Sequence, residues 1–139
     1  MNNGKNFGFT LFELLVVVSI IGILIGFGTV AFSSAQKRAR DARRQEDMKE
    51  VQSAMEQCYG LLDGAYPTGT YTAGNTVTCG SEVVIESFPD DPKPTMSYSG
   101  SVSDSSNYCF CAELESAEGN YGVGCSAGGI THFCITERQ

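Results

Sequence analysis

The chain has 139 residues and a net charge of −7, a size that suits one modest domain together with an anchor. Because there is no overall basic excess, the charge gives no indication of nucleic acid as a partner. All six cysteines follow the apolar amino-terminal segment, and an even number in a small, loop-rich module is typical of a disulfide framework outside the cytosol. A zinc site is the alternative, but the sequence has no CxxC pair and a single histidine.

The apolar segment at residues 14–32 reads LLVVVSIIGILIGFGTVAF and contains no charge. At about 1.5 Å per residue, this run and its flanks are long enough to cross a hydrocarbon layer of about 30 Å. A secretory signal has a shorter apolar run followed by a small-x-small cleavage site, and a buried core helix is rarely apolar on every face in so small a chain. The segment is therefore predicted to be a membrane-spanning helix.

Glu13 stands at the head of this run, four residues after Phe9. A carboxylate close to lipid is costly and tends to mark function, although an interfacial Glu that reaches water is the simpler interpretation. If the bond between Gly8 and Phe9 is cut, the new amino group of Phe9 lies one helical turn from Glu13. That cation, on the same chain or on a neighbouring copy, would attract the carboxylate far more strongly at low dielectric constant than in water.

The residues GFTLFELLVVVSIIGIL resemble the processing motif of type IV pilins and type II secretion pseudopilins, which carry class III signal peptides. The resemblance implies that a prepilin peptidase cuts after Gly8 and methylates the new amino terminus of Phe9. It also implies that Glu13 neutralises a neighbour's terminus during assembly. The implied partners are further copies of the chain in a helical filament, the pilus assembly ATPase and platform machinery, and the inner or plasma membrane before assembly.

Two features depart from the family's pattern. Many members have a proline where this chain has Val30, so Gly22, Gly26 and Gly28 are expected to provide either flexibility or close helix packing. In addition, five bases at residues 37–44 follow the anchor, whereas the leader offers only Lys5. The positive-inside rule alone would place the carboxy-terminal part in the cytoplasm. The cysteines and the resemblance predict the opposite orientation.

A helix is expected to continue through residues 33–62, which lack proline and are rich in helix formers. Apolar residues recur there at three- and four-residue steps: Met48, Val51, Met55, Cys58 or Tyr59, and Leu62. This stripe is expected to hold a small sheet. The spacing of Lys37 and Asp41, and of Arg43 and Asp47, predicts ion pairs along the surface. The basic cluster at residues 37–44 is interpreted as a solvated face, a headgroup contact, or a contact with acidic heads of neighbouring subunits.

Residues 63–139, called the head below, contain ten acidic and two basic residues and are rich in Gly, Ser and Thr. Strands are predicted near Val77 and at residues 95–99, 107–114 and 131–136, and residues 83–85 form either a strand or a short helix. Residues 107–114 place Tyr108, Phe110 and Ala112 on one face of a strand, with Cys109 and Cys111 on the other. The predicted fold class is α+β, with a long amino-terminal helix packed on a small antiparallel, disulfide-rich β-sheet.

The six cysteines are expected to stabilise the head, each bond contributing about 2–4 kcal/mol. Cys58, near the helix end, is expected to pair with Cys79. Cys109 and Cys111 would then pair with Cys125 and Cys134, in an order that the sequence leaves open.

No catalytic arrangement is recognised among the charged residues, so an enzyme is not expected. For calcium, the candidate ligands are Asp90, Asp91 and Asp104, although their spacing matches no known cation loop.

The sequence thus predicts a leader at residues 1–8, a transmembrane and fibre-core helix at 9–32, an amphipathic continuation at 33–62 and a disulfide-bonded β head at 63–139. The expected function is that of a structural subunit of a type IV pilus-like filament, first membrane-anchored and then extracellular or periplasmic. A pseudopilin of a type II secretion or DNA-uptake apparatus is one alternative. A monomeric membrane-anchored extracellular binding domain is another.

Overall fold

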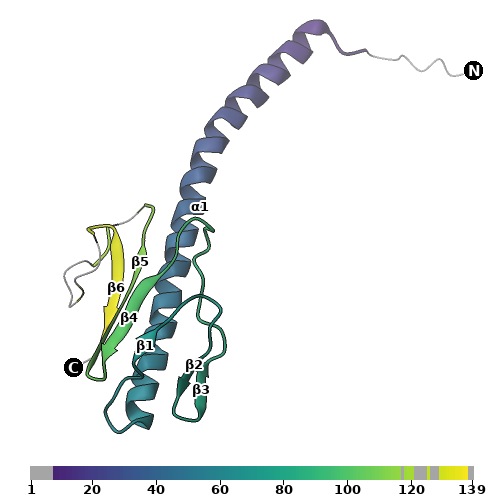
Figure 1. Ribbon diagram of the computed structural model, residues 1–139. Coiled ribbons are helices and arrows are strands. Elements are labelled where there is room, and N and C mark those ends of the chain that lie inside the picture. Colours follow the sequence, from purple (N-terminus) through teal and green to yellow (C-terminus); the bar gives the residue numbers. More distant parts are fainter. Residues whose placement is uncertain (1–7, 117, 121–124, 126–128, 138–139) are drawn as a thin grey trace, which may run out of the picture. The chain divides into compact units, whose positions relative to one another are not determined.

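A computed structural model describes residues 8–116, 118–120, 125 and 129–137 of the chain (Figure 1). The chain divides into two compact units, Met1–Gln36 and Lys37–Gln139, which are described separately. One helix, α1, extends over 51 residues from Leu11 to Leu61, close to the bounds that the sequence predicts. Residues 8–10 of the described chain precede it and are not helical.

The first unit consists, among its described residues, of the amino-terminal part of α1 and the three residues before it. Every side chain described there is exposed, and an 18-residue window reaches a mean hydropathy of 2.7. By length and composition, this helix is able to cross a membrane. No part of that window is buried against the rest of the chain.

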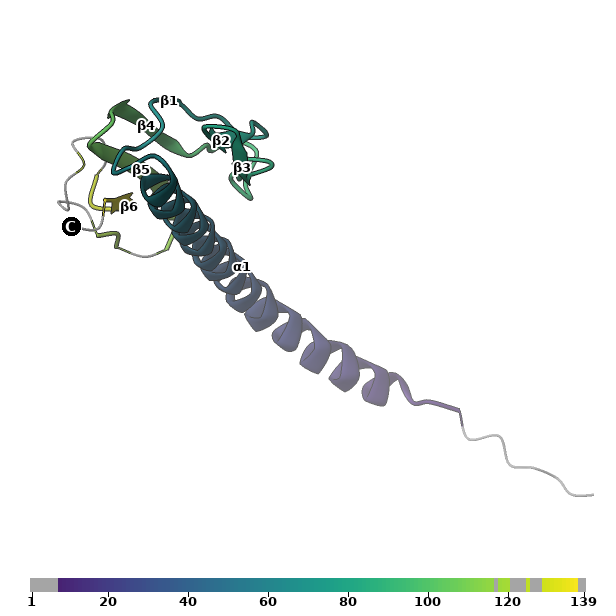
Figure 2. The ribbon, with the colours of Figure 1, turned by 90° about the horizontal axis from the view of Figure 1, so that it is seen from below.

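The second unit combines the remainder of α1 with an antiparallel sheet. The sheet has the strand order β1-β4-β5-β6, formed by Gly69–Thr70, Ser99–Asp104, Asn107–Glu113 and His132–Thr136. A separate hairpin contains β2 (Val77–Cys79) and β3 (Glu82–Ile85). Figure 2 shows β4, β5 and β6 beside the same stretch of α1. The small antiparallel sheet predicted from the sequence is therefore confirmed.

The core of this unit lies between α1 and the sheet. The helix contributes the apolar stripe of Met48, Val51, Ala54 and Met55. Strand β5 contributes Tyr108, Phe110 and Ala112, which alternate with Cys109 and Cys111 as the period of a strand requires. Burying each large side chain contributes about 1.5–3 kcal/mol. Tyr59 remains exposed, so Cys58 continues the stripe at this position.

The prediction of a strand at residues 95–99 is wrong, because the chain forms a turn in this segment. The amide of Met96 donates to the carbonyl of Lys93 (2.9 Å), and β4 begins only at Ser99. Sequence patterns miss strand β4 because it contains few apolar residues. Its Gly100 is required by close packing, since a Cβ atom there would lie 2.4 Å from the carbonyl oxygen of Cys109. The two-residue strand β1 was not predicted either.

Candidate assembly segment and helix–head ion network

The start of α1 is a capping box formed by Thr10 and Glu13. The Glu13 amide donates to Thr10 Oγ1 (3.2 Å), while the amide and hydroxyl of Thr10 both donate to Glu13 Oε2 (2.9 and 2.8 Å). This reciprocal arrangement satisfies amide groups that a helix end otherwise leaves unpaired. The TxxE spacing is visible in the sequence, although the capping box was not predicted from it. Glu13 thus has a structural role within its own chain.

The proposed cleavage position lies just outside the helix. Gly8 and Phe9 have no helical structure, and the Phe9 side chain is 83% exposed. A Cβ atom added at Gly8 would meet no atom within 4 Å, so contacts among the described residues do not explain why glycine stands there. The backbone at this position is therefore non-helical and exposed, next to the capped start of α1.

Large apolar side chains cover the part of α1 that belongs to the first unit. These side chains have no partner among the described residues. Phe12, Phe27 and Val30 are 72–77% exposed, and the other large apolar side chains between them are 39–65% exposed. Gly22 and Gly26 lie at the floor of a shallow apolar hollow, which Ile23, Phe27 and Val30 also line. A continuous apolar surface of this kind marks a membrane or protein contact rather than a face in water.

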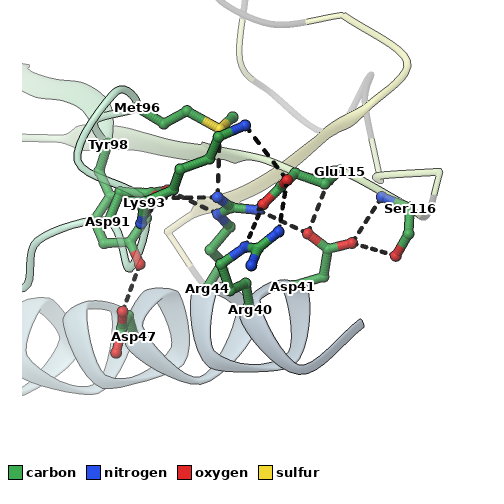
Figure 3. A network of polar contacts seen from close by, with 10 residues as sticks. All are labelled: Arg40, Asp41, Arg44, Asp47, Asp91, Lys93, Met96, Tyr98, Glu115 and Ser116. Atoms are coloured by element: carbon green, nitrogen blue, oxygen red, sulfur yellow. Dashed lines mark hydrogen bonds and ion pairs between the residues drawn. The ribbon is translucent and has the colours of Figure 1, made fainter. Parts of the chain in front are cut away.

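The second unit contains a buried arginine, Arg44, where α1 meets the head (Figure 3). Its Nε and Nη2 donate to the two carboxylate oxygens of Asp91 (2.7 and 2.8 Å). Its Nη1 donates to Asp41 Oδ1 (2.8 Å) and lies 3.0 Å from Glu115 Oε1. Arg44 is fully buried, and bidentate pairing of this kind gives both strength and defined geometry.

Glu115 and Asp41 extend the network to the segment after β5. Arg40 holds both oxygens of Glu115 through Nε and Nη2 (2.7 and 2.9 Å), and Lys93 Nζ lies 3.4 Å from Oε2. Asp41 accepts hydrogen bonds from the backbone amides of Glu115 and Ser116, both at 2.8 Å. Three cations thus face three carboxylates across the helix–head contact, drawn from α1, the loop before β4 and the segment after β5 (Figure 3).

Hydrogen bonding controls the ionisation of this network. The Arg40 guanidinium lowers the pKa of Glu115 to about 2, against an opposing effect of desolvation. Burial alone would raise the pKa of Asp41, but the hydrogen bonds from Ser116, the Glu115 amide and Arg44 together lower it. The carboxylates around Arg44, chiefly Asp91, raise the arginine's pKa. Glu115, Asp41 and Arg44 are consequently all charged at neutral pH.

These contacts correct three sequence-based interpretations. Asp41 pairs with Arg44 and the head instead of Lys37, and Asp47 accepts a hydrogen bond from Tyr98 (2.5 Å) instead of pairing with Arg43. Of the basic cluster, Arg40 and Arg44 are used inside the chain, while Lys37, Arg38 and Arg43 stay exposed.

The structure also defines the surroundings of the calcium candidates. Both Asp91 oxygens are engaged by Arg44. Asp104 binds its own turn through the amides of Ser106 and Asn107. Asp90 is exposed and accepts a hydrogen bond from the Asp91 amide. These contacts give Asp91 and Asp104 roles in the fold itself.

A second polar contact joins α1 to the sheet through Glu56. The Tyr108 hydroxyl donates to Glu56 Oε1 (2.8 Å), and the Tyr66 hydroxyl lies 3.4 Å from both oxygens. Burial, reinforced by the Glu56 charge, raises the pKa of Tyr66 to about 12 and also raises that of Tyr108. Both phenols therefore stay protonated and act as donors.

Three disulfides join the six cysteines: Cys58–Cys79, Cys109–Cys125 and Cys111–Cys134. The first fastens β2 to the end of α1. The other two lie on the face of β5 that points away from the main core. In the β5–β6 register Cys111 is directly opposite Cys134, which settles the pairing order in this structure.

Comparison with known proteins finds similarity in the amino-terminal region of the chain. The family described as the prokaryotic N-terminal methylation motif matches residues 3–29. The chain is 34% identical over 61 residues to the type IV major pilin protein PilA of Myxococcus xanthus (strain DK1622), covering 44% of this chain and 28% of that protein. The amino-terminal region of the chain is therefore similar to that of type IV pilins.

Two proteins of Dichelobacter nodosus extend the likeness to pilins. A probable minor fimbrial protein is 38% identical over 71 residues, covering 51% of this chain and 40% of the relative. A type IV major fimbrial protein FimA is 39% identical over 57 residues, covering 41% and 35%. The chain thus spans less than half the length of these pilin-family relatives. They are described as pilin or fimbrial proteins and not as enzymes, in agreement with the sequence-based expectation. No solved structure matches the chain.

Proposed function

We propose that the chain is the precursor of a structural subunit of a type IV pilus-like filament, cut between Gly8 and Phe9 and polymerised through its amino-terminal helix. The main support is the unpartnered apolar surface of the first unit, which directly follows the cleavage position within a methylation motif. Such a surface is stable in lipid or against other apolar helices. The hydrophobic effect operates in both settings, so transfer from membrane to filament avoids exposure to water.

The proposal assigns the precursor to the cell membrane and the mature subunit to an extracellular or periplasmic filament. A prepilin peptidase would act on the exposed, non-helical residues Gly8 and Phe9 and methylate the new terminus. An assembly ATPase and its membrane platform would then add subunits. The named relatives are pilins and fimbrial proteins, which favours a pilus over a secretion pseudopilus.

Glu13 is proposed to form an ion pair with the protonated amino terminus of Phe9 in a neighbouring subunit. The Thr10 amide and hydroxyl both donate to Oε2 and so hold the carboxylate at the helix start. The N-terminus of a helix stabilises negative charge, here that of the Glu13 carboxylate. A neighbour's amine would approach this end of α1 and find the carboxylate already oriented. The pairing would compensate the cost of placing Glu13 among apolar helices.

Replacing Glu13 with alanine tests this role. We expect Glu13→Ala to be processed and inserted like the unaltered chain, while the yield of sheared filaments falls sharply. A loss of about 1.4 kcal/mol per subunit contact weakens each addition about tenfold. Glu46→Ala is the matched control, because Glu46 is an exposed acid on the same helix in the second unit. Equal filament yields from the two variants would refute the assigned role.

A further inference from the structure

Four of the six cysteines gather in one small cluster on the face of the sheet away from α1. Cys109 and Cys111 project from the same face of β5, and Cys134 of β6 is directly opposite Cys111. Cys125 joins them through its bond to Cys109. The remaining pair, Cys58 and Cys79, belongs to the junction of α1 with β2 and is absent from this cluster.

Three of the sulfurs lie close to one another, and the fourth, of Cys134, is bonded to Cys111. The Sγ atoms of Cys109 and Cys111 are 3.9 Å apart, and those of Cys109, Cys111 and Cys125 all lie within 4.8 Å of one another. In a zinc tetrathiolate with bonds of about 2.3 Å, the sulfur–sulfur edge is about 3.8 Å. The sulfurs within each disulfide are covalently bonded and closer than this edge, so reduction has to let each pair separate before four thiolates reach the spacing of a zinc site.

We propose that the reduced form of this cluster, Cys109, Cys111, Cys125 and Cys134, binds one Zn²⁺ through four thiolates. Cys111, Cys125 and Cys134 are at most 8% exposed, so the metal would occupy a closed, structural type of site. Soft thiolate ligands select zinc over magnesium or calcium. The absence of a CxxC pair is no obstacle, because strand register and the tertiary fold bring the ligands together.

The same four sulfurs would exchange between a zinc-bound thiolate state and a disulfide state. Thiols persist in a reducing compartment, where the chain would hold zinc before its disulfides form. A low-molecular-weight disulfide such as oxidised glutathione supplies the oxidant afterwards. Two molecules of oxidised glutathione accept four electrons in total and are released as four glutathione thiolates. The four cysteine thiolates become the bonds Cys109–Cys125 and Cys111–Cys134, and Zn²⁺ is released.

The experiment compares two variants that each retain four cysteines. Cys58→Ser/Cys79→Ser keeps the complete cluster, whereas Cys109→Ser/Cys111→Ser keeps two of its members together with Cys58 and Cys79. The full-length chains are reduced with a phosphine in detergent micelles under nitrogen. Co²⁺ is titrated as a spectroscopic probe and is then displaced by Zn²⁺.

We expect Cys58→Ser/Cys79→Ser to bind one metal ion per chain, with the visible spectrum of tetrahedral Co²⁺ bound by four sulfurs. The Cys109→Ser/Cys111→Ser variant should bind at least about tenfold more weakly and should lack that spectrum, since two of the four ligands are missing. Oxidised glutathione should release one Zn²⁺ per loaded chain as two disulfides form. Equal binding by the two variants, or no tetrathiolate spectrum in the first, would overturn the proposal without affecting the filament function.

Discussion

Replacing Arg44 with methionine removes the cation at the centre of the helix–head network. The side chains of Arg44 and Asp91 are 0% and 1% exposed, so the substitution leaves the Asp91 carboxylate buried without its bidentate partner. Asp41 and Glu115 lose one contact each. Removing one partner of a buried ion pair lowers the free energy of unfolding by about 3–5 kcal/mol, because the other charge stays in the interior without compensation. We expect Arg44→Met to lower the free energy of unfolding by this amount at pH 7.

Urea unfolding of the full chain in micelles, followed by tyrosine circular dichroism, measures the effect. Arg43→Met is the matched control, since its side chain is exposed next to Arg44 and should change stability by less than about 0.5 kcal/mol. Adding Asp91→Asn to Arg44→Met should recover part of the loss, because the unpaired charge is removed. Equal stabilities of the Arg43 and Arg44 variants, or no recovery with Asp91→Asn, would refute the assigned role of the network.

Three further predictions concern pH, packing and the helix start. The pKa of Glu115 is lowered from 4.5 to about 2, so its ionised form should stabilise the fold above about pH 4.5, and this contribution should be lost as the pH falls toward 2. Glu115→Gln should flatten the dependence of unfolding free energy on pH in that range, and an unchanged profile would count against the pairing. Gly100→Ala should cost about 1–3 kcal/mol because its Cβ would collide with the Cys109 carbonyl. Gly60→Ala, where nothing lies within 4 Å, should instead be neutral or stabilising in a thermal melt, and similar melting temperatures would contradict this difference. Thr10→Ala should weaken the start of α1 by about 1 kcal/mol, seen as faster hydrogen exchange over residues 11–14, and unchanged exchange would exclude the capping box.

Local patterns were sufficient to predict the helix and the processing motif. The apolar run, the proline-free continuation and the stripe at Met48, Val51 and Met55 each follow from residues that are neighbours in the chain. The alternation in β5 likewise predicted that Tyr108, Phe110 and Ala112 share one face of the strand and that the cysteines lie on the other. These features depend on helix and strand periodicity, which is readable without knowledge of the tertiary structure.

The ion network required tertiary information, because its members are far apart in the chain. Arg44 and Asp91 are separated by 47 positions, and Arg40 and Glu115 by 75. From the sequence, the closer partners at four-residue spacing looked favourable, whereas burial makes the contacts to the head stronger. The disulfide order was open for a related reason: Cys109 and Cys111 share a face, so only the register with β6 distinguishes their partners.

The most direct test of the proposed function is the amino terminus of the protein recovered from cells that contain a prepilin peptidase. Intact-mass measurement and amino-terminal sequencing should find a chain that begins at Phe9 and carries one methyl group on its amine. Recovery of the protein with Met1 and the leader still attached, in cells that process a known prepilin, would contradict the proposal.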